Sequence, residues 1–193
     1  MNKEIERKYS VNDLPNNIKI SKIVDIEQAF IYRDNNTIIR IRKVTDKKQE
    51  IVQYIYTVKT KGDIQYKDDS NIGKKYEIES YIDKEQYEEL IQRKISNIIS
   101  KTRIDIPIEK ELKVEVDIYY DYLEGLLTAE IEFPNEEMAK TFNKPTWLGE
   151  ELGYKELSNR KLAEMTKEEW KSKVTKEFID NNRMLIHKLN GII

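Results

Sequence analysis

Hydrophobic and polar positions alternate over most of the first two thirds of the chain. Tyr, Ile, Val and Thr are concentrated there in short runs that end at clusters of Asp, Asn and Gly. Alternation with a period of two, interrupted by such turn residues, is typical of an antiparallel sheet built from hairpins. Asn35 and Asn36 are expected to form a tight turn because both tolerate positive φ. The predicted strands cover residues 3–9, 23–33, 37–44, 50–62, 74–82, 101–108, 110–120 and 126–134.

A helical period first appears between residues 83 and 100. Asp83, followed three residues later by Gln86, is typical of a capping box at a helix N-terminus. We predict one helix over this whole segment and a second, short helix over residues 135–142, after which no further strand is expected. The apolar positions at helical spacing in the first helix are Tyr87, Leu90, Ile91, Ile95 and Ile98.

The last part of the chain is predicted to be helical from about Asn159 onward. A stripe of large apolar side chains runs along it, and such a stripe indicates core packing or a partner face far more often than a membrane helix. We therefore predict a main domain over residues 1–165 and a C-terminal helical extension over residues 166–193. The extension is expected to cap the main domain or to mediate dimerisation. The stripe consists of Trp170, Val174, Phe178, Leu185 and Leu189.

Composition narrows the chemistry that such a fold can carry. Of the 193 residues 36% are charged, yet the formal net charge is only -2, so no global field attracts nucleic acid or anionic lipid. The chain has no cysteine and one histidine, His187, which argues against a zinc site of the His/Cys kind and a Ser-His-Asp triad. A metal would then be held by carboxylates, which favour Mg²⁺, Mn²⁺ or Ca²⁺. No apolar run approaches the roughly 20 residues of a membrane span, and we expect a cytoplasmic protein.

Charged residues of one sign stand two positions apart on nearly every predicted strand. Because alternate side chains leave a strand on the same face, the members of each pair point the same way. A solvated face usually mixes signs, and like charges about 7 Å apart repel each other, although a solvated face is still an alternative for any single pair. The same-sign pairs are Glu4 and Glu6, Arg40 and Arg42, Lys59 and Lys61, Glu77 and Glu79, Lys101 and Arg103, Glu115 and Asp117, and Glu130 and Glu132.

If the sheet closes into a barrel, all of these pairs can line one interior. A barrel of about eight strands has an interior just wide enough for side chains or one small ligand. With the charged faces turned inward, basic and acidic groups would line a wet lumen, because so many charges cannot be buried unless they are paired or coordinated. The complementary ligand is a polyanion together with a divalent metal.

The segments that carry these pairs together resemble a known family. The N-terminal EIERK resembles the E-x-E-x-K signature of the CYTH superfamily, the triphosphate tunnel metalloenzymes, and IRIRK, TVKTKG, YEIE, KTRI, VEVDIY, LLTAEIEF and WLGEEL follow in order. The resemblance covers roughly residues 1–162. It implies an α+β, mainly β fold, which is a closed eight-stranded antiparallel β-barrel (tunnel) with flanking helices and a C-terminal helical tail.

The resemblance also implies roles for individual residues. Phosphate would be bound by Lys8, Arg40, Arg42, Lys59, Lys101, Arg103 and Lys155. Divalent metal, Mg²⁺ or Mn²⁺, would be held by Glu4, Glu6, Glu130 and Glu132. Catalysis would involve Lys8, Glu77, Glu79 and Asp117. The segment that contains Lys155 departs from the family pattern, because Leu157 stands where a tyrosine is expected, and this leaves the tunnel's end undefined.

The activity that the resemblance implies is metal-dependent hydrolysis of a triphosphate, either inorganic tripolyphosphate or a small organic triphosphate. Adenylate cyclase, thiamine triphosphatase and RNA 5'-triphosphatase are alternatives within the superfamily, and RNA is the least expected substrate because the chain lacks global positive charge. A non-catalytic sensor that binds polyphosphate or a nucleotide is an alternative of another class. The expected partner is a small-molecule triphosphate, without nucleic acid or membrane.

Overall fold

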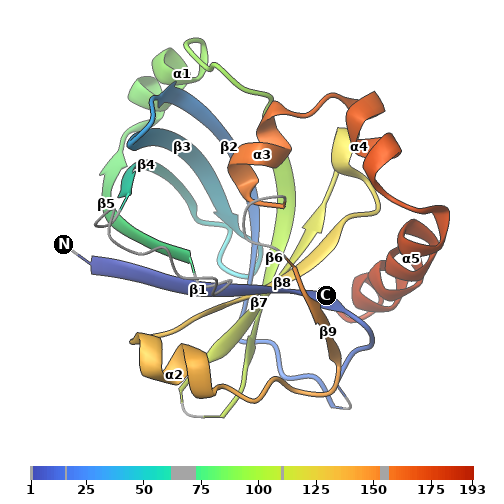
Figure 1. Ribbon diagram of the computed structural model, residues 1–193. Coiled ribbons are helices and arrows are strands. Elements are labelled where there is room, and N and C mark those ends of the chain that lie inside the picture. The colour runs from blue at the N-terminus through green and yellow to red at the C-terminus, as the bar shows by residue number, and fades with distance from the viewer. Residues whose placement is uncertain (1, 16, 62–72, 110, 153–156) are drawn as a thin grey trace.

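The computed structural model describes residues 2–15, 17–61, 73–109, 111–152 and 157–193, and their main feature is an antiparallel sheet (Figure 1). Nine strands of these described residues are joined in the order β5-β4-β3-β2-β6-β7-β8-β1-β9, and β1 pairs in addition with β5. A mainly β, antiparallel fold with a few helices is therefore confirmed. The strands are β1 (Asn2–Val11), β2 (Lys22–Arg33), β3 (Thr37–Asp46), β4 (Val52–Lys61), β5 (Gly73–Ile82), β6 (Ile99–Pro107), β7 (Lys113–Tyr119), β8 (Leu127–Glu132) and β9 (Leu148–Glu151).

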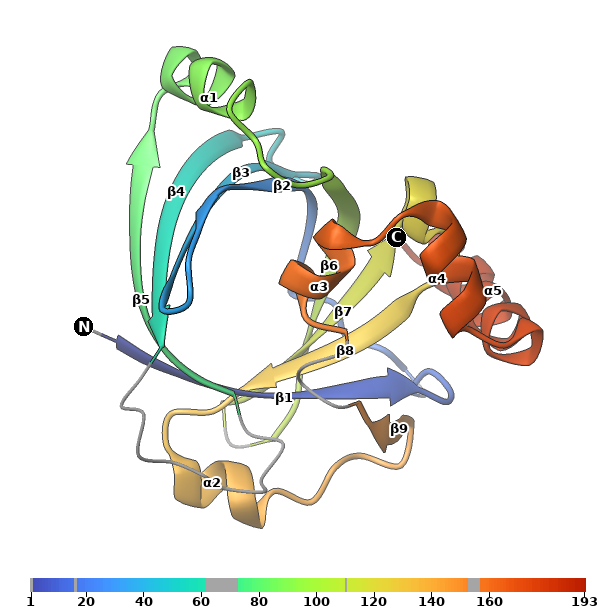
Figure 2. The ribbon, with the colours of Figure 1, turned by 45° about the horizontal axis from the view of Figure 1, so that its top comes forward.

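The sheet is strongly curved, as the right-handed twist of strands favours. In Figure 2, β2 to β5 arch over β1, β7 and β8, and α3 lies between the two groups. The helical segments are α1 (Lys84–Ile91), the 3-10 turn η1 (Asp121–Leu123), α2 (Glu136–Thr141), α3 (Asn159–Glu164), α4 (Lys167–Lys173) and α5 (Lys176–Asn190).

The turn between β2 and β3 forms by a different device from the one expected. The predicted hairpin turn is present, because Asp34 N–H donates to the carbonyl of Thr37 at 2.9 Å, but neither Asn35 nor Asn36 has a positive φ. Instead the Asp34 carboxylate accepts hydrogen bonds from the backbone N–H groups of Asn36 and Thr37, at 2.7 and 2.6 Å. Side-chain acceptors of this kind commonly replace the backbone pattern of a tight turn.

Helix α1 has the predicted capping box but is shorter than predicted. The Asp83 side chain accepts from the backbone N–H of Gln86, and the Gln86 side chain accepts in return from Asp83 N–H. The helix ends at Ile91 rather than near residue 100, because Ile95 N–H donates to the carbonyl of Phe30 at 2.8 Å and Ile99 already begins β6. Tertiary pairing thus overrides the helical period of the isoleucines.

The expectation that no strand follows residue 134 was also wrong. Strand β9 pairs with β1 opposite Tyr9 and Val11. The Arg7 guanidinium fixes this strand through two hydrogen bonds to the Glu151 carboxylate, of 2.9 and 2.6 Å. Four residues that include Gly149 are too few for a period of two to be recognised.

The apolar stripe of the C-terminal helices packs into the core, which was one of the two predicted alternatives. Leu185 and Leu189 of α5 belong to the same buried cluster as Val114 and Val116 of β7. Trp170 of α4 is 2% exposed and packs with Leu162 and other residues in a second cluster. The helix is interrupted between α4 and α5, where Thr175 caps α5. No helix among the described residues has the length and apolar character needed to cross a membrane.

Candidate active site

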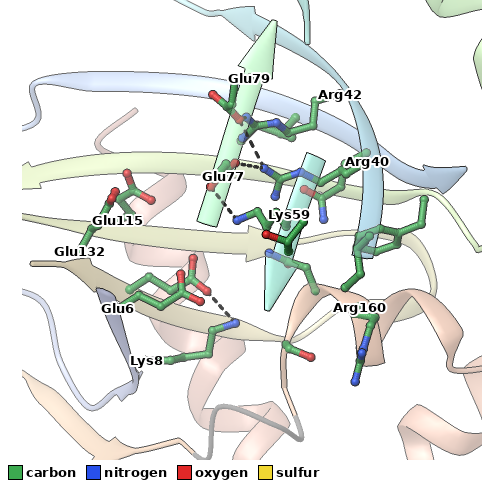
Figure 3. A pocket seen from close by; sticks show the side chains of 18 of the residues that line it. Glu6, Lys8, Arg40, Arg42, Lys59, Glu77, Glu79, Glu115, Glu132 and Arg160 are labelled. Carbon is green, nitrogen blue, oxygen red and sulfur yellow. Dashed lines mark hydrogen bonds and ion pairs between the residues drawn. The ribbon is translucent and has the colours of Figure 1, made fainter. Parts of the chain in front are cut away.

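The concave side of the sheet encloses a cavity of about 910 Å³. Strands β1 to β8 and helix α3 all contribute side chains to its wall (Figure 3). Among the described residues, the wall carries equal numbers of cationic and acidic side chains, seven of each. The cations are Lys8, Arg40, Arg42, Lys59, Lys101, Arg103 and Arg160, and the acids are Glu6, Asp34, Glu77, Glu79, Glu115, Glu130 and Glu132.

One part of the wall, on β3, β4 and β5, pairs arginines with glutamates. Arg40 Nη2 lies 3.1 Å from Glu77 Oε1, and Lys59 Nζ lies 3.0 Å from Glu77 Oε2. Glu79 accepts from Arg42, which lies beside it in Figure 3, and from the Thr57 hydroxyl. The register explains the contacts, because Glu77 and Lys59 are opposite each other on β5 and β4. Charges of opposite sign on β3, β4 and β5 are thus in contact.

The electrostatics of this part of the wall keep Glu79 ionised. Burial alone would raise the pKa of Glu79, but the charge of Arg42 and other neighbours more than offsets it, and the pKa is lowered. Burial, followed by the repulsion of Arg40, lowers the pKa of Arg42 to about 10. Glu79 is therefore a carboxylate at neutral pH, and Arg42 is still a cation.

A second part of the wall, on β6, β7, β8 and β1, is built around two acids. The Asp117 carboxylate accepts two hydrogen bonds from Arg103, both 2.7 Å long, and one from Lys101 of 2.5 Å. The Glu130 carboxylate accepts from Arg103 at 2.8 Å and lies 2.8 Å from Lys8 Nζ. Asp117 is fully buried and does not line the cavity itself, so it holds Lys101 and Arg103 from behind.

Burial and neighbouring charges together lower the pKa of both Glu130 and Lys101, which favours the charged form of Glu130 and the neutral form of Lys101. For Glu130, the cost of burial is outweighed by the charges of Lys8 and Arg103, and the pKa falls well below its ordinary value. For Lys101, burial and then the charge of Arg103 lower the pKa to about 8 in spite of the contact with Asp117. Lys101 therefore loses its charge as the pH rises just above neutral.

The acidic end of the cavity is formed by strand neighbours of like charge. Glu6 of β1 lies opposite Glu132 of β8, and Glu115 of β7 lies opposite Glu130 of β8. Figure 3 shows Glu6, Glu115 and Glu132 together on one side of the cavity, away from Arg40 and Arg42. Carboxylates arranged in this way are suited to a hard divalent cation.

These donors fit a metal that the substrate helps to hold. Among the described side chains, no three acids are placed to coordinate one ion without a ligand. Mg²⁺ commonly takes only one or two carboxylates and completes its shell with phosphate oxygens and water. The pair formed by Glu6 and Glu132 supplies that number of carboxylates. Glu130 contacts Lys8 and Arg103.

The structure brings most of the sequence-predicted residues to this one cavity. Asp117 lies behind the wall and does not line the cavity. Glu4 lies in β1, but its side chain is outside the described ones, and Lys155 lies outside the described residues. Those that line the cavity are Glu6, Lys8, Arg40, Arg42, Lys59, Glu77, Glu79, Lys101, Arg103, Glu130 and Glu132.

Sequence analysis missed three charged residues of the wall, Asp34, Glu115 and Arg160. Asp34 had been assigned only to the turn between β2 and β3, where its carboxylate does accept backbone hydrogen bonds. Glu115 had been noticed as the partner of Asp117 in a same-sign pair, and strand parity could have assigned it to the cavity. Arg160 belongs to α3, where Ser158 caps the helix by accepting from Lys161 N–H. The capping serine predicts a helix start, but nothing in the local sequence indicates that Arg160 faces the charged strands.

The cavity and its strands can be compared with known proteins. No family model matches the chain. An inorganic triphosphatase of Nitrosomonas europaea is 29% identical over 162 residues, which cover 83% of this chain and 96% of that protein. An inorganic triphosphatase of Acetivibrio thermocellus is 30% identical over 152 residues, 79% of this chain and 86% of that protein.

A solved structure agrees with these sequence relatives. The crystal structure of an inorganic triphosphatase matches with a TM-score of 0.56 and 27% identity, and the match covers 84% of this chain and 95% of the other. These matches cover about four fifths of this chain and most of each relative. On the sequence match to the Acetivibrio protein, and in agreement with the charged strand pairs, the chain belongs to the inorganic triphosphatase family of the CYTH superfamily.

Proposed function

We propose that the protein is a divalent-metal-dependent triphosphatase whose cavity takes inorganic tripolyphosphate in preference to a small organic triphosphate. The observation that carries this proposal is the cavity wall, which has seven cations and seven acids among the described residues. A basic region around Arg40 and Arg42 lies away from the acidic end that Glu6, Glu115 and Glu132 form (Figure 3). The relatives that match the chain over most of its length are inorganic triphosphatases.

The charge balance of the wall supports a metal as part of the ligand. Because the described cations and acids of the wall are equal in number, these residues provide no surplus positive charge for a polyanion that carries several negative charges. A divalent cation that accompanies the phosphate chain would supply that charge at the acidic end. Bound there by Glu6 and Glu132, with Glu4 as the further ligand expected from the sequence, Mg²⁺ or Mn²⁺ would neutralise phosphate oxygens and activate the leaving group.

The sheet itself is proposed to close into an eight-stranded barrel. Strand β1 is paired with β8 through residues such as Lys8 and Glu130, and with β5 through Asn2 and Glu77. This double pairing supports closure, with β9 added outside the ring next to β1. A ring of this size holds one small ligand, and its strands hold the charges rigidly.

The basic region would position the phosphates for reaction. Glutamates now pair with Arg40, Arg42 and Lys59. A phosphate chain would displace these glutamates, because it is the stronger partner for the three cations. Phosphoryl transfer is accelerated chiefly by positioning and by charges that stabilise the transition state, so fixed guanidinium and ammonium groups supply much of the catalysis. Lys101 and Arg103, held by Asp117, would serve the same purpose from the opposite wall.

The glutamates released by the phosphates are the candidates to orient the attacking water. Glu79 has a lowered pKa, so its carboxylate accepts a hydrogen bond at neutral pH. Glu77 lies beside it and contacts the same arginine, Arg40. Lys8, which lies between Glu130 and the carbonyl of Leu157, would hold the phosphate at the other wall.

The C-terminal extension is proposed to complete the fold of residues 1–165 rather than to form a dimer. Leu185 and Leu189 are buried against the outer face of the sheet, so this face of α5 is already covered. The absence of cysteine fits a reducing compartment, and we propose a cytoplasmic location.

A phosphate-release screen tests the proposal. Tripolyphosphate, pyrophosphate, ATP and thiamine triphosphate are each incubated with Mg²⁺, with Mn²⁺ and with chelator. We expect the fastest release from tripolyphosphate and none in chelator. Arg40→Gln should reduce kcat/KM for tripolyphosphate by roughly tenfold or more, since it removes a charge-assisted contact.

Arg183→Gln is the matched control, because Arg183 is an exposed arginine of α5 far from the cavity wall. It should leave the rate unchanged. Tight binding of tripolyphosphate without phosphate release under any metal would contradict the proposed hydrolysis and favour a sensor. Release from ATP that exceeds release from tripolyphosphate would contradict the proposed substrate.

A further inference from the structure

Three buried hydrogen-bond donors on the wall of the cavity have no partner among the described residues. They are the side-chain amide Nε2 of Gln28 and the Nε atoms of Arg40 and Arg42. All three residues line the cavity. Buried donors in folded proteins are almost always hydrogen-bonded, so a cluster of three that are not requires an explanation.

The three donors come from neighbouring positions on two paired strands. Gln28 of β2 lies opposite Arg42 of β3, and Phe30, the next inward residue of β2, lies opposite Arg40. On its other side Gln28 lies opposite Ile99 of β6, which offers no side-chain acceptor. One sector of the wall thus presents two guanidinium groups and one amide to the same space.

Gln28 itself is as deeply buried as a core residue. Only 1% of it is exposed, and its inward neighbours along β2, Ile26 and Phe30, are buried apolar residues. An amide in such surroundings cannot turn toward bulk water to satisfy its donor. The folded protein therefore keeps an unpaired polar group aimed at the cavity, which costs free energy unless a ligand pairs with it.

We propose that Gln28 is a substrate-binding residue whose amide N–H donates to a phosphate oxygen held by Arg40 and Arg42. This inference rests on the proposed triphosphatase function. A phosphate group offers several acceptor oxygens in a tetrahedral arrangement, so it can accept from three donors at once, whereas one water molecule accepts only two hydrogen bonds. The contact would also be independent of pH, since an amide does not titrate.

The replacement Gln28→Met tests the inference, because methionine has a similar length but no N–H donor. We expect kcat/KM for tripolyphosphate to fall by roughly tenfold or more, which is typical of a lost hydrogen bond to a charged group. Tripolyphosphate with Mg²⁺ should raise the thermal unfolding midpoint of the unmodified protein. The same ligands should raise the midpoint of Gln28→Met by less. Without ligand, the midpoint should stay the same or rise, because the variant no longer buries an unpaired donor.

The replacement Gln28→Glu keeps the shape and places a carboxylate beside both arginines. It should raise the unliganded midpoint through new ion pairs and weaken tripolyphosphate binding more than Gln28→Met does. Gln53→Met is the matched control, since Gln53 is a strand glutamine of β4 that does not line the cavity. It should change neither the rate nor the ligand-induced shift.

The outcomes separate this inference from the function on which it rests. An active unmodified protein whose Gln28→Met and Gln28→Glu variants keep full kcat/KM and the full ligand-induced shift would overturn the inference alone. Variants that melt earlier without ligand yet bind tripolyphosphate normally would assign Gln28 a structural role instead. An unmodified protein that neither hydrolyses tripolyphosphate nor is stabilised by it would overturn both proposals.

Discussion

Glu6 on β1 lies directly opposite Glu132 on β8, at the acidic end of the cavity. Like charges placed opposite each other on antiparallel strands destabilise a sheet. We predict that Glu132→Gln raises the free energy of unfolding of the metal-free protein by about 0.5 kcal/mol and largely abolishes metal-dependent phosphate release. Denaturant unfolding in chelator measures the first effect, and a Mg²⁺ titration of the rate measures the second.

Glu150→Gln is a suitable control for this pair. Glu150 is an exposed residue of β9 that does not line the cavity. Its replacement should leave both the Mg²⁺ dependence and the stability nearly unchanged. If Glu132→Gln retained the rate and the Mg²⁺ dependence of the unmodified protein, Glu132 could not be a metal ligand.

Arg160 of α3 differs from the other cations of the cavity wall. Among the residues that the structure describes, the other six each contact an acidic side chain, and Arg160 contacts none. It therefore need not give up a partner to bind phosphate. We predict that Arg160→Gln raises KM for tripolyphosphate several-fold, on the order of the effect of one exposed charge-assisted contact, without changing the unfolding midpoint.

The adjacent Lys161 provides the comparison, because it lies outside the cavity wall and is half-exposed near Glu164. Lys161→Gln removes one positive charge from the same short helix. Equal effects of the two replacements on KM would indicate a general electrostatic contribution of α3 rather than a contact made by Arg160.

The rate should depend on pH through Lys101, whose pKa burial and Arg103 lower to about 8. Below that pH the side chain is protonated and binds phosphate, and above it the cation is lost. We expect kcat/KM for tripolyphosphate to fall as the pH rises through about 8. In Lys101→Arg the fall should move to higher pH because a guanidinium keeps its proton. A pH profile that is identical in the two proteins would assign the fall to another group.

Strand parity made most of the cavity wall predictable from the sequence. Residues two apart on a strand share a face whatever the tertiary structure, so Arg40 and Arg42, or Glu130 and Glu132, had to point together. The partner of each charge was not predictable, because it depends on which strands are neighbours and in what register. Asp117 illustrates the limit, since it shares a face with Glu115 but lies behind the wall, beneath Lys101 and Arg103.

The elements that sequence analysis misjudged were those whose local pattern competes with tertiary pairing. Ile95 continues a helical period, yet its backbone is bonded to β2 and its side chain is 59% exposed. Strand β9 is too short to have a period of its own and exists because β1 offers it an edge. The same holds for Arg160, which only the packing of Leu162 and Ala163 of α3 brings to the cavity.

A replacement in the buried face of the C-terminal helix α5 should lower the stability of the protein without changing its catalytic rate. Leu189 is fully buried on the outer face of the sheet, and Asn182 of the same helix donates to the carbonyl of Gly125 at 2.9 Å. We predict that Leu189→Ala lowers the free energy of unfolding by about 2–5 kcal/mol while kcat/KM for tripolyphosphate, measured well below the melting temperature, stays the same. Met184→Ala, at a position of α5 that is 55% exposed, should change the stability by less than about 0.5 kcal/mol. Equal stability of the two variants would show that residues 166–193 are not part of the cooperative core. Loss of activity in a folded Leu189→Ala variant would show that α5 acts on the cavity as well as on the fold.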